Sequence, residues 1–223
     1  MHEFRKGSWR LIEELGRRYS VRVIVYLRPQ APYLESIYRQ YLKNPRGINA
    51  EFGSSMTIQE LMAHPRIKQN LDYYDSIRQW AAVLGEDHIL VRRYVSDIVD
   101  DFLSLLRVPK TKHFLEPKRN LSVTRDMAEL LRSINTSFDD QRRAIIIANM
   151  ERAIEKKTTR QDATFLSPAE SRELMACYQE CNCRVARQWL GEKELFPDYR
   201  APDCVAWTPA RIDLDGMLAM YGA

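Results

Sequence analysis

The sequence predicts an α/β fold with few parallel strands and a largely helical C-terminal half. Two segments, 21–27 and 88–95, are rich in β-branched and apolar residues, as buried strands are. Between them, apolar residues recur at helical spacing, which predicts helices separating the two strands. Strands that alternate with helices are typical of βαβ units, in which the strands run parallel.

The first elements follow from local patterns. Residues 4–18 place apolar and basic side chains on opposite sides of a helix. Residues 21–27 are almost wholly apolar, which indicates a strand buried on both faces, and Arg28-Pro29 ends it. The next helix is predicted to begin near Pro32, because proline suits a first helical turn, and to run to about Lys43.

The middle of the chain alternates between loop and regular patterns. Residues 44–69 contain prolines and glycines, so we expect a long loop with at most a short helix. Residues 70–84 have the spacing of one helix, and Gly85 is predicted to end it. After the strand at 88–95, Ser96 or Asp97 is expected to cap a helix.

The C-terminal half is predicted to consist of helices followed by an irregular tail from residue 192. Ser122 or Thr124 is expected to open one helix, and the Ser137-x-x-Asp140 pattern a second that runs to about Lys157. The capping box at 167–170 opens a third helix, which is predicted to end at Gly191. Its spacing places Cys177 and Cys181 toward the core.

Composition excludes several classes of function. The chain has eight glycines, no two closer than six positions, so a Walker-type phosphate loop and a GxGxxG turn are both absent. The four cysteines lack a usual zinc spacing, and we expect no metal. No run of about 18 apolar residues could span a membrane. Since no signal-peptide pattern is present either, we expect a cytoplasmic protein with reduced cysteines.

The net charge of +4 is unevenly distributed along the chain. Residues 1–46 hold ten Lys and Arg against four Asp and Glu, whereas residues 47–223 hold 24 against 26. Arginine supplies 25 of the 34 cations, and its planar fork suits phosphate and sulfate. The excess favours an anionic partner for the first fifth of the chain, with a solvated helix face as the alternative.

Arg28 and Ser36 are the residues whose placement suggests a binding site. Arg28 directly follows the first predicted strand, and ligands of open α/β sheets bind beyond the carboxyl ends of the strands. Ser36 lies eight positions later, in the first turns of the next helix and near its partly positive N-terminus. The pair predicts a pocket for one phosphate group, bound by charge-assisted hydrogen bonds and one hydroxyl. A surface ion pair is the alternative for Arg28.

This segment resembles a known family. Residues 23–38, Val-Ile-Val-Tyr-Leu-Arg-Pro-Gln-Ala-Pro-Tyr-Leu-Glu-Ser-Ile-Tyr, are similar to the 3′-phosphate-binding motif of sulfotransferases that use 3′-phosphoadenosine 5′-phosphosulfate (PAPS). The motifs that follow resemble bacterial sulfotransferase-like proteins: Leu-Asp-Tyr-Tyr at 71–74, Trp80, Leu-Gly at 84–85, Ile-Leu-Val-Arg-Arg-Tyr at 89–94 and Asp-Ile-Val-Asp-Asp-Phe-Leu at 97–103. The resemblance covers residues 1–135 well and the C-terminal helices more loosely.

The resemblance implies a partial P-loop NTPase-like sulfotransferase fold. It makes residues 1–223 one domain, with an α/β nucleotide-binding part at 1–110 and a mainly helical part at 111–223. It implies PAPS as co-substrate, bound by Arg28 and Ser36, and transfer of sulfate to a hydroxyl acceptor. A saccharide acceptor is expected only by analogy with bacterial relatives.

The resemblance also implies catalytic groups. The family places a His or Glu base upstream of the 3′-phosphate arginine, and His2 and Glu3 are the residues that could occupy that place. Against this, the first residues of a chain are usually frayed. Lys118 and Arg119 could supply the basic group that the family places late in the chain, although a solvated loop is the alternative.

One part of the family pattern is missing. The phosphosulfate-binding loop precedes the 3′-phosphate motif in the family, and the glycine spacing excludes it here. We therefore expect this chain alone to be incomplete or inactive. It could be trimmed, a half-protein that needs an N-terminal segment, or a non-catalytic remnant that dimerises to cover an open sheet edge. A binding module for an anionic partner is the other alternative, although no nucleic-acid-binding signature occurs.

Overall fold

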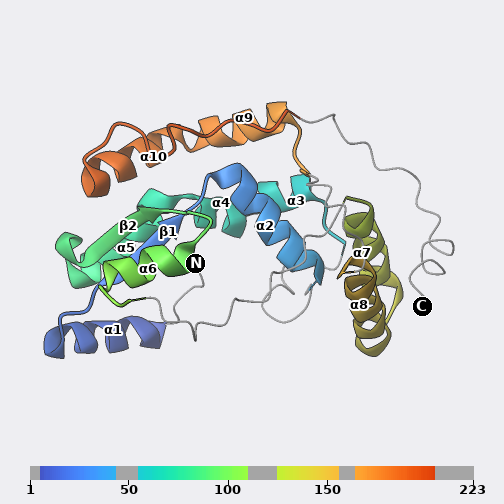
Figure 1. Ribbon diagram of the computed structural model, residues 1–223, viewed down its shortest axis with the longest axis horizontal. Helices are drawn as coiled ribbons and strands as arrows, with labels where there is room; N and C mark the ends of the chain where they lie inside the picture. Colours follow the sequence, from blue (N-terminus) through green and yellow to red (C-terminus); the bar gives the residue numbers. More distant parts are fainter. Residues whose placement is uncertain (1–5, 44–54, 110–124, 156–163, 204–223) are drawn as a thin grey trace. The chain divides into compact units, whose positions relative to one another are not determined.

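The computed structural model describes residues 6–43, 55–109, 125–155 and 164–203 (Figure 1). Six residues named in the sequence predictions lie outside these ranges: His2, Glu3, Lys118, Arg119, Ser122 and Thr124. The chain divides into two compact units, the first formed by residues 1–30, 68–118 and 175–199 and the second by residues 31–67, 119–174 and 200–223. Among the described residues, no helix is both long enough and apolar enough to cross a membrane.

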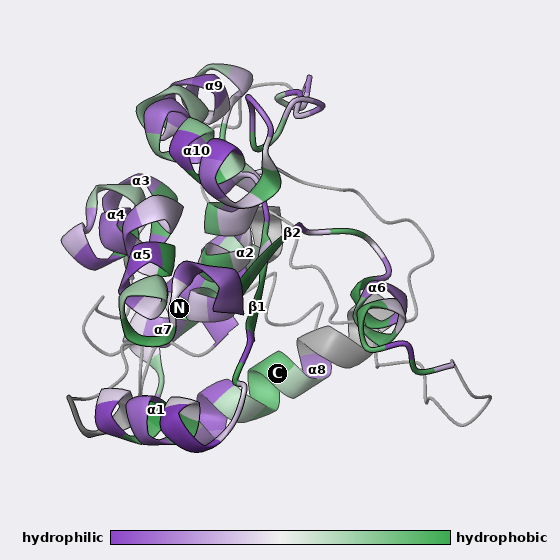
Figure 2. Cartoon of the chain, turned by 90° about the vertical axis from the view of Figure 1, so that its left-hand side faces the viewer, coloured by the Kyte–Doolittle hydropathy of each residue, from purple (hydrophilic) through white to green (hydrophobic). Residues whose placement is uncertain are grey.

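The first unit contains a two-stranded sheet. Strand β1 (Val23–Leu27) pairs with β2 (Ile89–Arg93) in parallel, from Val23 opposite Ile89 to Leu27 opposite Arg93. Helix α6 (Ile98–Leu105) lies on one face of the sheet, and α5 (Tyr73–Leu84) and α10 (Gln179–Val185) lie on the other (Figure 2). Helix α1 (Lys6–Arg18) packs on α5. The mixed α/β class and the parallel pairing are thus confirmed.

Strand β1 is less buried than its sequence predicts. Leu27 is buried, but the other four residues of the strand are only half-buried. A strand buried on both faces needs neighbours on both edges and cover on both sides. In the described part of the chain β1 pairs only with β2, so the prediction of a fully buried strand is wrong for these residues.

Several predicted helix boundaries are confirmed, and each rests on a local signal. Helix α2 (Gln30–Lys43) ends where predicted and begins two residues before Pro32. Helix α5 ends at Gly85, whose φ of 95° is in the left-handed region that glycine tolerates. Asp97 caps α6, since its side chain accepts a hydrogen bond from the backbone N–H of Asp100 at 3.1 Å.

The predicted loop at 44–69 contains two helices within its described part. Helix α3 (Ile58–Ala63) begins with a capping box in which Thr57 and Glu60 bond to each other's backbone N–H groups. Pro65 is the first residue of α4 (Pro65–Leu71) rather than part of a loop. The helix predicted at 70–84 is also interrupted, because Asp72 caps α5 by accepting from the Asp75 N–H at 3.0 Å. A short 3₁₀ turn, η2 (Glu86–His88), leads into β2.

The second unit has its own core, in which α2 and α3 supply apolar residues together with α7 (Arg125–Ser137). Polar contacts fix the end of α2. The Asn135 amide donates to the Leu42 carbonyl and Arg143 of α8 (Asp140–Glu155) to the Lys43 carbonyl, each at 3.0 Å. These bonds satisfy carbonyls that a helix C-terminus leaves unpaired. Helix α8 is capped by Asp139, which accepts from the Arg142 N–H at 2.8 Å, and not by the predicted Ser137.

The helix predicted at 168–191 is broken into three parts. The capping box of Ser167 and Glu170 opens α9 (Pro168–Cys177), as predicted. Tyr178 leaves helical geometry, and α10 and a π-helical segment, η3 (Ala186–Leu190), follow before the predicted stop at Gly191. Cys177, the last residue of α9, is exposed, and Cys181 of α10 is half-buried, so the predicted core position of Cys177 is wrong. The buried residues of α9 are Ser171 and Leu174, and Cys177 does not share their face.

Candidate phosphate site at the carboxyl end of the first strand

Arg28 lies at the carboxyl end of the parallel sheet in the first unit. It follows Leu27 directly, and the Tyr94 N–H continues the sheet by donating to the Leu27 carbonyl at 2.7 Å. The Arg28 guanidinium carbon lies 5.2 Å from the centre of the Tyr94 ring, a cation–π contact that stacks the two groups. The ring is 47% exposed. Arg28 thus stands where open α/β sheets bind their ligands.

The Arg28 side chain is available to a ligand. Within the described ranges no carboxylate forms an ion pair with its guanidinium, so the predicted alternative of a surface ion pair is not seen there. The neighbouring strand differs in this respect, because Arg92 pairs with Asp101 and Arg93 pairs with Glu192. A half-buried arginine that stacks on a ring and has no carboxylate partner among the described residues suits an oxyanion, because the guanidinium N–H groups lie in one plane.

Buried polar contacts hold the residues around Arg28. The Tyr73 hydroxyl donates to the Arg28 carbonyl at 2.7 Å. The Gln30 side chain is fully buried and exchanges two hydrogen bonds with the Asn182 amide, at 2.8 and 3.0 Å. The Gln30 amide also lies 3.4 Å from the Leu71 carbonyl. The turn that carries Arg28 is thereby attached to three other parts of the first unit.

Ser36 belongs to the second compact unit, and Arg28 to the first. Ser36 is the seventh residue of α2 and is exposed. Its neighbour Glu35 explains why: this carboxylate is buried and accepts hydrogen bonds from the Phe165 and Leu166 N–H groups, at 2.7 and 3.1 Å. Arg39, one turn along α2, pairs with Glu35 at 3.4 Å. Because these contacts turn Glu35 inward, the Ser36 hydroxyl is left open to solvent.

A second polar cluster lies near the same, carboxyl end of the β1–β2 pairing, one residue pair before its last, and involves α6. The Tyr26 hydroxyl donates to the Asp101 carboxylate at 2.6 Å, and Arg92, directly opposite Tyr26 in the sheet, pairs with the same carboxylate. The Arg92 and Tyr26 hydrogen bonds lower the pKa of Asp101. Burial, together with the bond to Asp101, raises the pKa of Tyr26. The cluster attaches α6 to the sheet, and in it the Arg92 guanidinium is already paired with Asp101.

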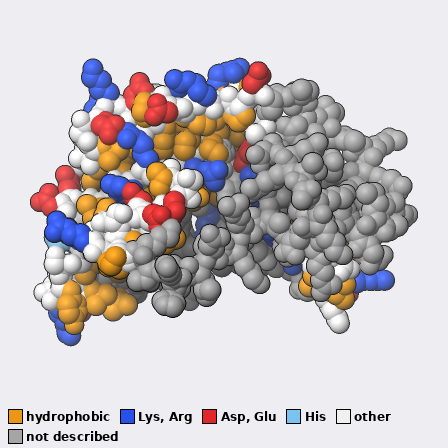
Figure 3. All heavy atoms as spheres, in the orientation of Figure 1, with side chains coloured by type: hydrophobic (Ala, Val, Ile, Leu, Met, Phe, Trp, Pro, Cys, Tyr) orange, Lys and Arg blue, Asp and Glu red, His pale blue; other side chains and the backbone are white. Residues whose placement is uncertain are grey.

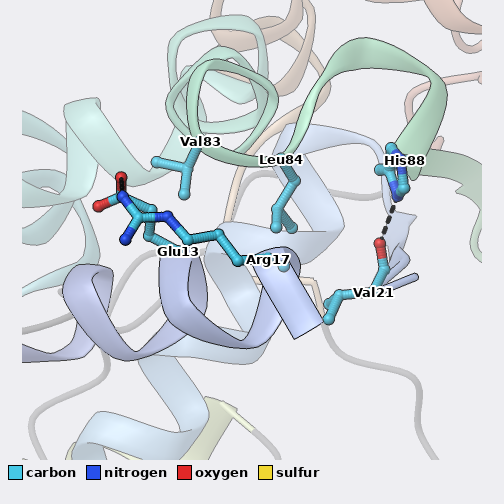
Figure 4. A pocket seen from close by; sticks show the side chains of 7 residues that line it. Glu13, Arg17, Val21, Val83, Leu84 and His88 are labelled. Atoms are coloured by element: carbon cyan, nitrogen blue, oxygen red, sulfur yellow. Dashed lines mark hydrogen bonds and ion pairs between the residues drawn. The ribbon is translucent and has the colours of Figure 1, made fainter. Parts of the chain in front are cut away.

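A cavity of about 270 Å³ lies at the amino ends of the strands, far from Arg28 in the strand direction. Figure 4 shows its lining, in which Val21 precedes β1 and His88 precedes β2. The His88 Nδ1 donates to the Val21 carbonyl at 2.6 Å, and Arg17 pairs with Glu13 at 2.8 Å. These polar groups are bonded to one another, so they are less available to bind a ligand than the Arg28 guanidinium at the opposite end of the sheet.

Part of the positive charge of the first 46 residues is paired with carboxylates of the same helix. In the face shown in Figure 3, Lys and Arg side chains are spread over the described surface among acidic ones. In α1, Arg17 and Arg18 pair with Glu13 and Glu14. Among the described residues, no group of three or more His, Cys, Asp or Glu side chains is arranged to hold a metal ion.

The position of Arg28 after the first strand was predicted, but the residues that hold the chain around it were not. Tyr73 is 45 positions from Arg28, and Asn182 is 152 positions from Gln30, so no local pattern relates them. The only available signal was the Leu-Asp-Tyr-Tyr motif that carries Tyr73.

Comparisons with known proteins leave the family open. No family model matches the chain, and no solved structure matches it. An Archaeoglobus fulgidus protein described as "Uncharacterized protein" is 25% identical to this chain over 186 residues. The match covers 78% of this chain and 47% of that protein, so the chain spans about half the length of the curated relative it matches.

Proposed function

We propose that this chain is a sulfotransferase-like protein that binds PAPS through its 3′-phosphate, with Arg28 as the main phosphate ligand. One observation carries the proposal: Arg28 stands at the carboxyl end of a parallel strand, stacked on Tyr94, with no carboxylate of the described residues paired to it. The motif from Val23 to Tyr38 resembles the family's 3′-phosphate motif, and this resemblance supports the 3′-phosphate as the ligand of Arg28.

Arg28 and Ser36 have different parts in the proposed site. Arg28 supplies charge-assisted hydrogen bonds, which are about twice as strong as neutral ones. Ser36 supplies one neutral hydroxyl donor from an exposed position on α2. It lies in the second turn of that helix, and the helix dipole falls off within the first turn. Most of the affinity is therefore assigned to Arg28.

The reaction proposed is sulfuryl transfer to a hydroxyl acceptor, with a saccharide as the acceptor class. The acceptor oxygen attacks sulfur as the bond from sulfur to the 5′-phosphate oxygen breaks. A base takes the hydroxyl proton, and the products are a sulfate ester and 3′,5′-adenosine bisphosphate. His2 or Glu3 is the proposed base. The donors that stabilise the moving sulfuryl group must come from a phosphosulfate loop on another segment, because the glycine spacing of these residues provides none.

Calorimetric titration with 3′,5′-adenosine bisphosphate tests the proposal. Arg28→Ala should weaken binding by about ten- to hundredfold, the loss typical of a charge-assisted hydrogen bond. Arg22→Ala is the matched control, since it removes the same charge from the residue before β1, at the other end of the strand. Equal affinities in the wild type and Arg28→Ala would contradict the assignment. Loss of affinity in both variants alike would instead favour the alternative, a module that attracts anions by charge alone.

A further inference from the structure

The peptide group between Arg28 and Pro29 can be held from one side only. Proline has no backbone N–H, so the nitrogen of this peptide cannot donate a hydrogen bond. The Arg28 carbonyl oxygen is therefore the one polar atom of this peptide group through which a hydrogen bond can fix the peptide plane. The Tyr73 hydroxyl donates to that carbonyl at 2.7 Å. We infer that Tyr73 is a positioning residue for Arg28, an inference that rests on the proposed phosphate site.

Tyr73 is itself well fixed. It is the first residue of α5, directly after the capping residue Asp72, and its side chain is 3% exposed. Its ring meets the Phe196 ring edge-on, with centres 6.5 Å apart. A rigid phenol at a helix start thus holds the backbone of a residue that ends a strand. The peptide plane in turn sets the direction in which the Arg28 side chain leaves the backbone.

The proposed role acts through the entropy of binding. An arginine side chain has many rotamers, and immobilising such a side chain on binding costs affinity. With the Arg28 peptide fixed and the guanidinium stacked on Tyr94, part of that freedom is already lost in the free protein. Removing the Tyr73 hydroxyl restores rotamer freedom to the Arg28 side chain in the unbound protein. The affinity for phosphate then falls, although no group that touches the ligand has been changed.

The chain offers a matched control for this experiment. Tyr178 makes the same kind of hydrogen bond within the same unit, from its hydroxyl to the Lys68 carbonyl at 3.1 Å. Its hydroxyl bonds to Lys68 and not to a residue next to Arg28. Tyr178→Phe and Tyr73→Phe each remove one hydroxyl and keep the ring. If the two hydroxyls contribute only to stability, both variants should have a lower free energy of unfolding. Neither variant should then have a lower affinity for phosphate.

The test is titration of the full chain with 3′,5′-adenosine bisphosphate, well below the melting temperature of each variant. We expect Tyr73→Phe to weaken binding by about three- to tenfold, the cost of ordering a side chain on binding. Tyr178→Phe should stay within about twofold of the wild type, a change too small to reflect a lost ordering cost. In an Arg28→Ala background, Tyr73→Phe should have no further effect. The Arg28 Nε–H signal, followed by NMR relaxation without ligand, should report greater motion in Tyr73→Phe only.

Two contrary results separate the claims. If Arg28→Ala abolishes binding while Tyr73→Phe and Tyr178→Phe bind equally well, the positioning role is wrong and the phosphate site stands. If Arg28→Ala binds as the wild type does, the phosphate site fails and the positioning role fails with it. Unchanged motion of the Arg28 side chain in Tyr73→Phe overturns the positioning role whatever the affinity.

Discussion

Gln30 and Asn182, 152 positions apart, exchange two amide hydrogen bonds in the core of the first unit. Both side chains are buried, at 0% and 3% exposure. The pair joins α10 to the residue that follows Arg28-Pro29, so the C-terminal helices help to hold the proposed phosphate site. A buried amide that loses its partner is left with unsatisfied donor and acceptor groups.

Breaking this pair should destabilise the protein in a non-additive way. Asn182→Leu leaves the Gln30 side-chain oxygen without its donor, and we expect the free energy of unfolding to fall by about 1–3 kcal/mol. Gln30→Leu should cost a similar amount. The double change removes both polar groups, so its cost should be smaller than the sum of the two. Urea titration followed by circular dichroism measures all four proteins, and additive losses would show that the two amides are not coupled.

The Asp101 cluster should make stability depend on pH in the acid range. Arg92 and Tyr26 lower the pKa of Asp101 in the folded state from its ordinary 3.8. A carboxyl group with a lowered folded pKa binds fewer protons when folded than when unfolded. Its contribution is therefore present above pH 3.8 and is lost as the pH falls through the folded value.

Asp101→Asn should remove that dependence. The urea midpoint should be lower than that of the wild type at pH 7, and should fall less between pH 5 and pH 2. Asp87→Asn, which removes an exposed carboxylate from η2, is the control and should follow the wild type. An Asp101→Asn protein with the full acid dependence of the wild type would show that this carboxylate does not contribute to it.

Ser36→Ala should affect binding and stability in opposite directions. The hydroxyl is exposed, and alanine is the best helix former, so the free energy of unfolding should stay the same or rise slightly. Affinity for 3′,5′-adenosine bisphosphate should fall by about three- to tenfold, as expected for the loss of one neutral hydrogen bond. Ser104→Ala, at an exposed position of α6, is the control for the substitution. Unchanged affinity in Ser36→Ala would remove Ser36 from the site.

The chain alone should transfer sulfate at or near the background rate. The 3′-phosphate is remote from the reacting sulfur and is held about equally in the ground and transition states, so Arg28 and Ser36 do not lower the barrier. One oxyanion donor is commonly worth about 3–4 kcal/mol, and the loop that would supply such donors is not in these residues. Radiolabelled PAPS with a panel of saccharides and phenols measures this rate. Turnover by the purified chain that vanishes in Arg28→Ala would mean that the catalytic groups have been misplaced.

Local signals predicted much of the fold. Gly85, Gly191, Asp97 and the capping box at 167–170 end or begin helices as predicted, because each acts through its own backbone conformation or a bond within one turn. The sequence also contained the capping box of Thr57 and Glu60, but the prolines around it favoured a loop. The loop prediction failed because Pro65 starts a helix instead of ending one.

Other features could not be predicted, because distant residues decide them. The helix predicted to run to Gly191 is broken at Tyr178, whose hydroxyl donates to the Lys68 carbonyl, 110 positions away. The place of Arg28 between β1 and α2 was predictable because a strand end followed by a helix start is a local pattern. Tyr73 was missed because its relation to Arg28 exists only once α5 has packed beside the sheet.

The central claim is that Arg28 recognises the 3′-phosphate, and one thermodynamic cycle tests it most directly. The wild type and Arg28→Ala are each titrated with 3′,5′-adenosine bisphosphate and with adenosine 5′-monophosphate, which lacks the 3′-phosphate. The wild type should prefer the bisphosphate by about tenfold or more, as a charge-assisted contact to the extra phosphate predicts. Arg28→Ala should bind the two nucleotides alike. A wild type without this preference, or an Arg28→Ala protein that keeps it, would contradict the claim.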